Sequence, residues 1–358
     1  MTNDQREAWK KFLAGKQLGP YILDGFRGGG EYGLVFNAVD TRTDDRRAIK
    51  VLTPGSQTHD MMEFEDEGRL LRKLARSSSV VTIHDSGEAV LEIDSDRGIS
   101  LPFKYHVLER ATEPLTSLLA DESIRRDLDW EEKIQLWRGA VRGIHQMHLK
   151  KCVHRDIKSS NCLLFLQARN RTECKIADLG KARDLSEPAR LPPAKYLVAR
   201  GDLRFAPPEF LFLQGRGNEP SFKLGDLYGL GSLLFEIATG QGITAVALGF
   251  GPTILRQNIQ DHQLGIRTDL SGLRPQYSRA FAVLDRELPQ NIRFRVSSLV
   301  RQLCDPVPEM RLPRTFAGRR RHPGEGLQWL LRQADILIRS SCIPQQRQPL
   351  TRVGGRTV

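Results

Sequence analysis

The sequence has few cysteines, and their spacing argues against a disulfide framework. Among 358 residues there are five, and no Cys-x-x-Cys pair occurs. An odd number of cysteines without such a pair is typical of free thiols. We therefore expect reduced cysteines and a cytoplasmic protein. The five are Cys152, Cys162, Cys174, Cys304 and Cys342.

Long apolar segments are missing as well. The first 17 residues are rich in charge and contain no apolar core, so we expect no signal peptide. No run approaches the ~18 apolar residues that a membrane-spanning helix needs. The longest apolar stretch, residues 229–240, is interrupted by Glu236 and is typical of a buried core helix.

The fractions of hydrophobic and charged residues are ordinary for a globular protein. Hydrophobic residues make up 39% of the chain and charged residues 27%, which is enough for a sizeable core. The net charge of +11 at pH 7 would suit an acidic partner such as nucleic acid. Net charge alone is weak evidence, and the arginine run 319–321 equally fits a solvated surface or a substrate-docking patch. We therefore expect no nucleic-acid partner, and the sequence leaves the oligomeric state open.

The chain changes character near residue 110. Before it, helical periodicity at 4–14 and 60–75 alternates with short β-type runs. These runs are at 21–26, 33–39, 46–52, 79–93 and 101–109. After residue 110 helical patterns dominate, at 129–149, 224–239, 273–285, 292–304 and 325–340. For the first of these, Asp129 and Glu132 predict a capping box. The order predicts a small β-rich lobe followed by a larger helical lobe, an α+β fold.

A glycine cluster opens the set of chemical motifs. Gly28, Gly30 and Gly33 are spaced so that the backbone can approach phosphates, because no Cβ intervenes. A dinucleotide-binding turn shares this string, but it leads into a helix. Residues 34–52 instead have the pattern strand, turn, strand. Taken alone, the cluster also fits a plain structural turn.

Lys50 lies within the apolar run Ala48–Leu52. A buried ammonium without a partner is costly, so this side chain needs an anion nearby. Phosphate oxygens and a helix carboxylate are the candidates. Among the carboxylates of the helix expected at 60–75 we choose Glu67, with Glu63 and Glu65 as competitors.

The most informative string is His154–Asn161. It offers a base-like carboxylate in Asp156, a phosphate-directed cation in Lys158 and a metal-ligating amide in Asn161. Asp178 follows at the end of an apolar strand pattern. A carboxylate there can hold Mg²⁺ while leaving coordination positions for phosphate and water.

In this order the motifs resemble the signature set of eukaryotic-type protein kinases. Three later strings are similar to further family elements: Pro207–Glu209 to Ala-Pro-Glu, Asp226–Gly231 to the D-x-W-x-x-G helix start, and Asp305–Arg311 to the late arginine element. The last implies a buried ion pair between Arg311 and Glu209. The resemblance covers about residues 20–340 and is weakest at 240–300. The brevity and arginine content of the chain look bacterial.

The resemblance implies a division of the chain and roles for its site residues. It implies a helical extension at 1–19, a kinase domain at 20–342 and a disordered tail at 343–358. Within the domain we expect an N-lobe at 20–109, a hinge at 110–113 and a C-lobe at 114–342. Implied ATP-binding residues are Gly28, Gly30, Gly33, Val35, Ala48, Lys50, Glu109, Ala111 and Leu163, with Leu108 as gatekeeper. Implied catalytic residues are Asp156, Lys158, Lys50 and Glu67, and implied Mg²⁺ ligands are Asn161 and Asp178.

The chain also departs from the family pattern. Asp202 stands where a serine/threonine kinase usually has threonine, which puts the choice of acceptor hydroxyl in doubt. Between Asp178 and Glu209 the hydroxyl-bearing residues are Ser186 and Tyr196. We expect either phosphorylation there or activation without it, with Glu187 or Asp202 as a fixed anion.

The implied function is transfer of the γ-phosphoryl group of ATP to serine or threonine of protein substrates, with Lys158 favouring these acceptors. A pseudokinase that acts as a scaffold or nucleotide switch is the alternative, and so is a small-molecule kinase. An active enzyme is favoured over the pseudokinase because Lys50, Glu67, Asp156, Asn161 and Asp178 are all present. The lysine of the HRDxK string and the Ala-Pro-Glu-like element disfavour a small-molecule kinase.

Overall fold

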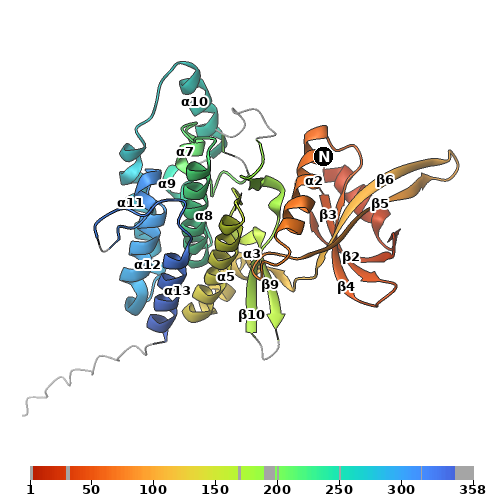
Figure 1. Ribbon diagram of the computed structural model, residues 1–358, viewed down its shortest axis with the longest axis horizontal. Coiled ribbons are helices and arrows are strands. Elements are labelled where there is room, and N and C mark those ends of the chain that lie inside the picture. Colours follow the sequence, from red (N-terminus) through yellow and green to blue (C-terminus); the bar gives the residue numbers. More distant parts are fainter. Residues whose placement is uncertain are drawn as a thin grey trace, which may run out of the picture.

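The chain forms a sheet-based N-lobe and a helical C-lobe (Figure 1). This confirms the α+β, two-lobe arrangement. The computed structural model describes residues 3–29, 33–167, 171–188, 198–199, 201–249, 251–315 and 317–342. The tail expected at 343–358, and also Gly30 and Tyr196, lie outside the described residues.

The N-lobe is an antiparallel sheet with the strand order β1-β2-β3-β4-β6-β5. Its strands are β1 (Gln17–Leu18), β2 (Tyr21–Gly29), β3 (Gly33–Asp40), β4 (Arg46–Leu52), β5 (Ile83–Asp94) and β6 (Ile99–Glu109). The strand expected at 79–93 begins later, because Val80 and Val81 pair instead with Ile176 in the C-lobe. Helix α2 (Thr58–Lys73) lies between this sheet and the C-lobe (Figure 1).

Helix α1 (Asn3–Leu13) packs into the same core as the sheet. Leu13 is fully buried, and the rings of Trp9 and Phe12 lie 5.6 and 6.0 Å from that of Phe103, centroid to centroid. The pattern expected at 4–14 therefore forms a helix that contributes apolar area to the N-lobe, rather than one that stands apart from it.

The C-lobe consists mainly of helices. Those longer than ten residues are α5 (Trp130–Leu149), α8 (Glu219–Thr239), α10 (Gly251–Gln263), α11 (Arg274–Glu287), α12 (Gln290–Leu303) and α13 (Gln328–Ser341). The shorter ones are α3 (Leu115–Ala120), α4 (Glu122–Asp127), α7 (Pro208–Leu211) and α9 (Ile243–Leu248). Short strands β7 (Glu113–Pro114), β8 (Cys152–Val153), β9 (Cys162–Gln167), β10 (Arg171–Ile176) and β11 (Arg183–Asp184) lie on the side toward the N-lobe.

Three details differ from the expectations. Asp129 occupies the N-cap position of α5, but its side chain makes no capping hydrogen bond, so the predicted capping box is wrong. Strand β10 agrees with the apolar strand pattern before Asp178, but β9 and its pairing with β10 were not foreseen. Helix α10 was also missed, in the region where the family resemblance is weakest.

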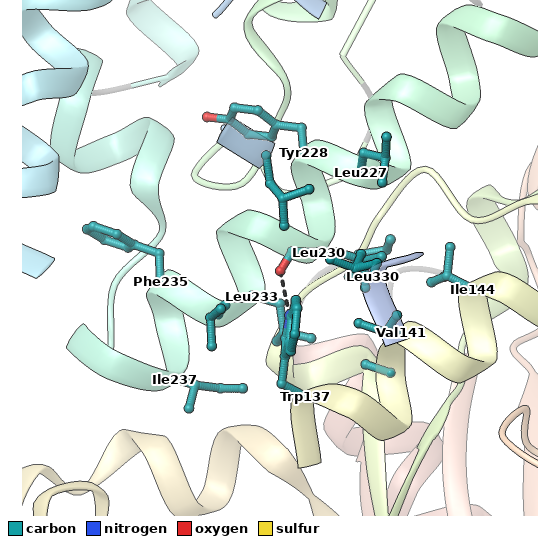
Figure 2. Packing of buried hydrophobic residues seen from close by; sticks show 14 of the residues in the cluster. Trp137, Val141, Ile144, Leu227, Tyr228, Leu230, Leu233, Phe235, Ile237 and Leu330 are labelled. Atoms are coloured by element: carbon teal, nitrogen blue, oxygen red, sulfur yellow. Dashed lines mark hydrogen bonds between the residues drawn. The ribbon is translucent and has the colours of Figure 1, made fainter. Parts of the chain in front are cut away.

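The core of the C-lobe lies between α5 and α8. Helix α8 is buried from Phe222 to Thr239, as the apolar stretch around Glu236 predicted. Trp137 of α5 packs against it, and its indole N–H donates to the carbonyl oxygen of Leu230 at 2.8 Å (Figure 2). None of the described helices is both long enough and apolar enough to cross a membrane.

A buried ion pair ties α7 to the segment before α13. Both terminal nitrogens of Arg311 donate to the Glu209 carboxylate, at 2.7 and 2.6 Å, and Arg311 is 0% exposed. Its remaining donors reach the carbonyl oxygens of Leu224 and Asp305, both at 3.0 Å. This two-point geometry with further hydrogen bonds is what makes a buried charge pair tolerable. The pair expected from the sequence is present.

Trp137→Ala is expected to lower the free energy of unfolding by about 3–5 kcal/mol, because it opens a cavity and leaves the Leu230 carbonyl without its donor. Urea denaturation followed by circular dichroism measures the change. Phe294→Ala is the matched control: Phe294 is 82% exposed, so its loss should cost less than about 0.5 kcal/mol. Equal losses for the two variants would contradict this account of the core.

Candidate active site

A cavity of about 610 Å³ lies between the lobes. Its lining includes most of the residues that the sequence singled out, brought from β3, β4, α2, the hinge and the segments around β9 and β10. These are Gly28, Val35, Ala48, Lys50, Glu67, Leu108, Glu109, Ala111, Asp156, Lys158, Asn161, Leu163 and Asp178. Gly30 lies outside the described residues, and Gly33 is not among the lining residues. A Cβ at Gly33 would come within 2.5 Å of the Val51 carbonyl oxygen.

Lys50 of β4 lies at the centre of a buried charge cluster. Its ammonium nitrogen is 2.6 Å from a Glu67 oxygen and 3.1 Å from Asp178 Oδ1. Burial alone would lower the pKa of Lys50, but the charges of Asp178 and Glu67 outweigh burial and raise it above its ordinary value. The ammonium in turn holds the pKa of Asp178 below its usual range. Burial raises the pKa of the Glu67 carboxyl, and the charge of Lys50 opposes that rise. One ammonium is thus shared between two acidic side chains.

The other two glutamates of α2 have different partners. Glu63 lies 3.4 Å from the Lys181 ammonium, and Glu65 lies 2.5 Å from that of Lys104. Of the three, Glu67 is the one that contacts Lys50. The reason is helical spacing: Glu67 is four residues after Glu63 on the buried face, whereas Glu65 is exposed and pairs with Lys104 of β6.

The orientation of α2, and so of Glu67, depends on His106 of β6. Its Nε2 donates to the Phe64 carbonyl oxygen at 2.8 Å, which leaves Nδ1 to accept from the Ser86 hydroxyl at 2.9 Å. The imidazole stacks on the Phe64 ring with centroids 4.0 Å apart, and a side chain at Gly68 would collide with it. Burial lowers the pKa of His106 to about 4, so the ring is neutral at physiological pH.

Two buried carboxylates of α8 hold the loop His154–Asn161 in place. The buried Asp226 carboxylate accepts from the backbone N–H groups of His154 and Arg155, both at 2.9 Å. Glu236 accepts from the backbone and hydroxyl of Ser159 at 2.9 and 2.5 Å. These two carboxylates position the loop, and neither of them lines the cavity. The sequence had flagged Asp226 as part of a motif but gave no sign of this role for Glu236.

Within the loop, the three polar side chains contact one another. Asn161 Nδ2 donates to the backbone oxygen of Asp156 at 2.8 Å and to its Oδ2 at 3.1 Å. Lys158 lies 3.1 Å from the same Oδ2. Asp156 is therefore oriented from two sides, and its carboxylate faces the cavity together with the Lys158 ammonium.

Asn161 and Asp178 are suited to a divalent cation. The Asn161 amide nitrogen donates to Asp156, so Oδ1, which lies 3.5 Å from the Ser160 hydroxyl, is the atom that can ligate a cation. The side chain of Asp178 is 44% exposed, into the cavity, and the residue has a left-handed backbone (φ 54°). One carboxylate and one amide oxygen are a donor set that Mg²⁺ accepts when water and phosphate complete its shell. The residues present therefore fit the cation.

Asp202 contacts the site through its backbone. Its N–H donates to Asp156 Oδ1 at 3.3 Å, while its carboxylate turns away to form an ion pair with Arg204 at 2.6 Å. Gly201 has φ of +80°, and a Cβ there would collide with the Asp156 carboxylate. The segment thus approaches Asp156 closely without using a side chain.

The segment after Asp178 is linked to α2 by ion pairs that need no phosphate. Lys73 of α2 donates to the Asp184 carboxylate at 2.6 and 2.7 Å and to the Ser186 hydroxyl at 2.7 Å. Arg69 of α2 pairs with Glu187. These contacts hold the C-terminal half of α2, which also carries Glu67, so they favour the position of α2 in which Lys50 is engaged.

Comparison with known proteins agrees with these observations. A family model described as "Protein kinase domain" matches residues 21–317. The chain belongs to the protein kinase family. Members of this family act on proteins and use ATP with Mg²⁺.

Individual relatives are similar at low identity. A probable serine/threonine-protein kinase PknB of Bifidobacterium longum is 28% identical over 239 residues, which are 65% of this chain and 32% of the relative. Mitogen-activated protein kinase 15 of Rattus norvegicus is 27% identical over 302 residues, 82% of this chain and 51% of the relative. Cyclin-dependent kinase 12 of Drosophila melanogaster is 31% identical over 223 residues, 59% and 17% of the two chains. The chain spans about half or less of the length of these relatives.

His106 is expected to make the protein acid-sensitive. Because its folded pKa of about 4 is below the usual 6.5, the stability it contributes is complete above pH 6.5 and is lost as pH falls toward 4. The loss at pH 4 is about 3 kcal/mol. His106→Gln should therefore have a lower free energy of unfolding than wild type at pH 7. Its free energy of unfolding should fall less steeply as pH is lowered from 7 to 4, measured by urea unfolding. His262→Gln, at an exposed position of α10, is the control, and a His106→Gln profile parallel to wild type would contradict the assignment.

Proposed function

We propose that this protein is an active kinase that transfers the γ-phosphoryl group of ATP to serine or threonine hydroxyls of protein substrates. The observation that carries the proposal is the engaged Lys50–Glu67–Asp178 cluster facing Asp156 across one cavity. Positioning and charge stabilisation are most of what phosphoryl transfer needs from a protein.

Each side chain has a role that its contacts support. Lys50, oriented by Glu67, holds the α- and β-phosphates, and the apolar side chains of Val35, Ala48 and Leu163 enclose the base. The backbone of Glu109 and Ala111 supplies hydrogen bonds to the edge of the base. Mg²⁺ held by Asn161 and Asp178 would offset charge on the β- and γ-phosphate oxygens.

In the transfer step, Asp156 accepts the proton of the substrate hydroxyl as its oxygen bonds to the γ-phosphorus. The bond from that phosphorus to the bridging β–γ oxygen breaks, and ADP leaves with the electron pair. Lys158, 3.1 Å from Asp156, stabilises charge on the transferred group.

The replacement of threonine by Asp202 is compatible with this step. The Asp202 backbone N–H, rather than a hydroxyl, bonds to Asp156, so Asp156 keeps an orienting donor on this side. The Asp202 carboxylate is neutralised by Arg204 and adds little negative charge at the acceptor. Lys158 remains the feature that favours serine and threonine over tyrosine.

We also propose a cytoplasmic location. All five cysteines are free thiols in the structure, and four of them are buried. Cysteines of this kind suit a reducing compartment, where disulfides do not persist.

Asp156→Ala should lower the rate of phosphoryl transfer on the order of 10²–10⁴-fold, because it removes the proton acceptor. The assay uses radiolabelled ATP and a generic protein substrate, followed by phosphoamino-acid analysis, in which phosphoserine and phosphothreonine are expected. Asp96→Ala, in the exposed turn between β5 and β6, is the matched control. No transfer by the wild type, or transfer by Asp156→Ala at the wild-type rate, would leave the pseudokinase as the better description.

Activity is expected to be independent of phosphorylation between residues 178 and 188. Phosphatase-treated wild type should keep its rate, whereas Asp184→Asn should lower kcat/KM about tenfold, because its buried carboxylate holds Lys73. Glu187→Gln should lower kcat/KM only about two- to fivefold, because the ion pair with Arg69 is about one-third exposed and is screened by solvent. Glu92→Gln, exposed on β5, is the control. A wild type inactivated by phosphatase would refute the expectation.

A further inference from the structure

Arg27 occupies a β-bulge immediately before the glycine cluster. In the β2–β3 pairing Phe26 lies opposite Phe36 and Gly28 lies opposite Val35, so Arg27 is the additional residue on β2. A bulge re-aims the side chain of its extra residue. Phe26 packs on Phe36, ring centroids 5.6 Å apart, whereas the Arg27 side chain lines the cavity.

The Arg27 guanidinium reaches across to the hinge. Its Nη1 donates to the carbonyl oxygen of Ala111 at 2.7 Å, and Nη2 donates to that of Thr112 at 2.5 Å. A planar cation that donates to two successive carbonyl groups is held in a single orientation. The stem of the glycine-rich segment is thereby tied to the chain that joins the two lobes.

Neighbouring groups support this position of the guanidinium. Asn37 Oδ1 lies 3.4 Å from Arg27 Nη1 and also accepts from Arg110 Nε at 3.1 Å. The Glu113 carboxylate attracts Arg27 and lines the same cavity, whereas the charge of Arg110 opposes it. The hydrogen bonds of Arg27 therefore come from β3 and from the middle of the hinge, and Glu113 adds an attractive charge.

We propose that Arg27 is a clasp across the mouth of the nucleotide cavity and that it controls nucleotide exchange. The two walls that it joins are the end of β2, which carries Gly28 and Gly29, and the hinge, between which a nucleotide enters and leaves. Its hydrogen bonds to Ala111 and Thr112 have to break before these walls separate. The inference rests on the nucleotide-binding part of the proposed function, and it assigns Arg27 a positioning role rather than a chemical one.

Stopped-flow fluorescence with N-methylanthraniloyl-ADP and Mg²⁺ tests the clasp. Arg27→Leu removes both hydrogen bonds and should raise the dissociation rate constant about tenfold. Arg27→Lys keeps the charge, but one ammonium cannot span two carbonyl groups, so its rate constant should also rise, to an intermediate value. Arg46→Leu removes an exposed arginine from the neighbouring strand β4 and should behave as wild type.

The outcomes separate the clasp from the proposed function. If wild type binds the fluorescent nucleotide and both Arg27 variants release it at the wild-type rate, the clasp is wrong and the kinase proposal stands. If wild type binds no nucleotide, both are wrong. Thermal denaturation verifies that each variant is folded, and Arg27→Lys, the milder change, carries the test if Arg27→Leu does not fold.

Discussion

The rest of the site depends on one buried cation. Lys50 is 6% exposed, and an ammonium in that position is stable only with its two carboxylates in place. Glu67 belongs to a helix of the N-lobe and Asp178 to the C-lobe side of the cavity. Meeting the charge requirement of Lys50 therefore fixes β4, α2 and the segment after β10 relative to one another, and it is this requirement that assembles the cavity wall.

Buried carboxylates repeat the same principle in the C-lobe. Asp226 and Glu236, both on α8, bond to backbone N–H groups of the loop that carries Asp156, and Glu209 binds Arg311. Each is a charge that the interior tolerates because several donors converge on it. Helix α8 is buried from Phe222 to Thr239 and still carries acids, because these acids bond to the loop that carries Asp156.

The contacts that can be broken lie at the edges of this rigid frame. Arg69 with Glu187 and Arg27 with the hinge carbonyl groups are partly exposed and join elements that can move apart. Such bonds contribute little to global stability but bias the arrangement of α2 and of the cavity mouth. In our proposal, these peripheral arginines rather than the buried cluster control the site.

The sequence by itself determined the two-lobe order, most long helices, and the set Lys50, Asp156 and Asp178, because local periodicity and closely spaced polar motifs are carried by neighbouring residues. Only the tertiary structure decided which acid of α2 reaches Lys50, what Glu236 holds, and that Arg27 spans to Ala111, 84 residues away. The capping box at Asp129 failed for the converse reason, since a local pattern permits a contact without requiring it. Contacts between residues that are far apart in the sequence depend on the three-dimensional path of the chain. Composition and motif spacing do not predict that path.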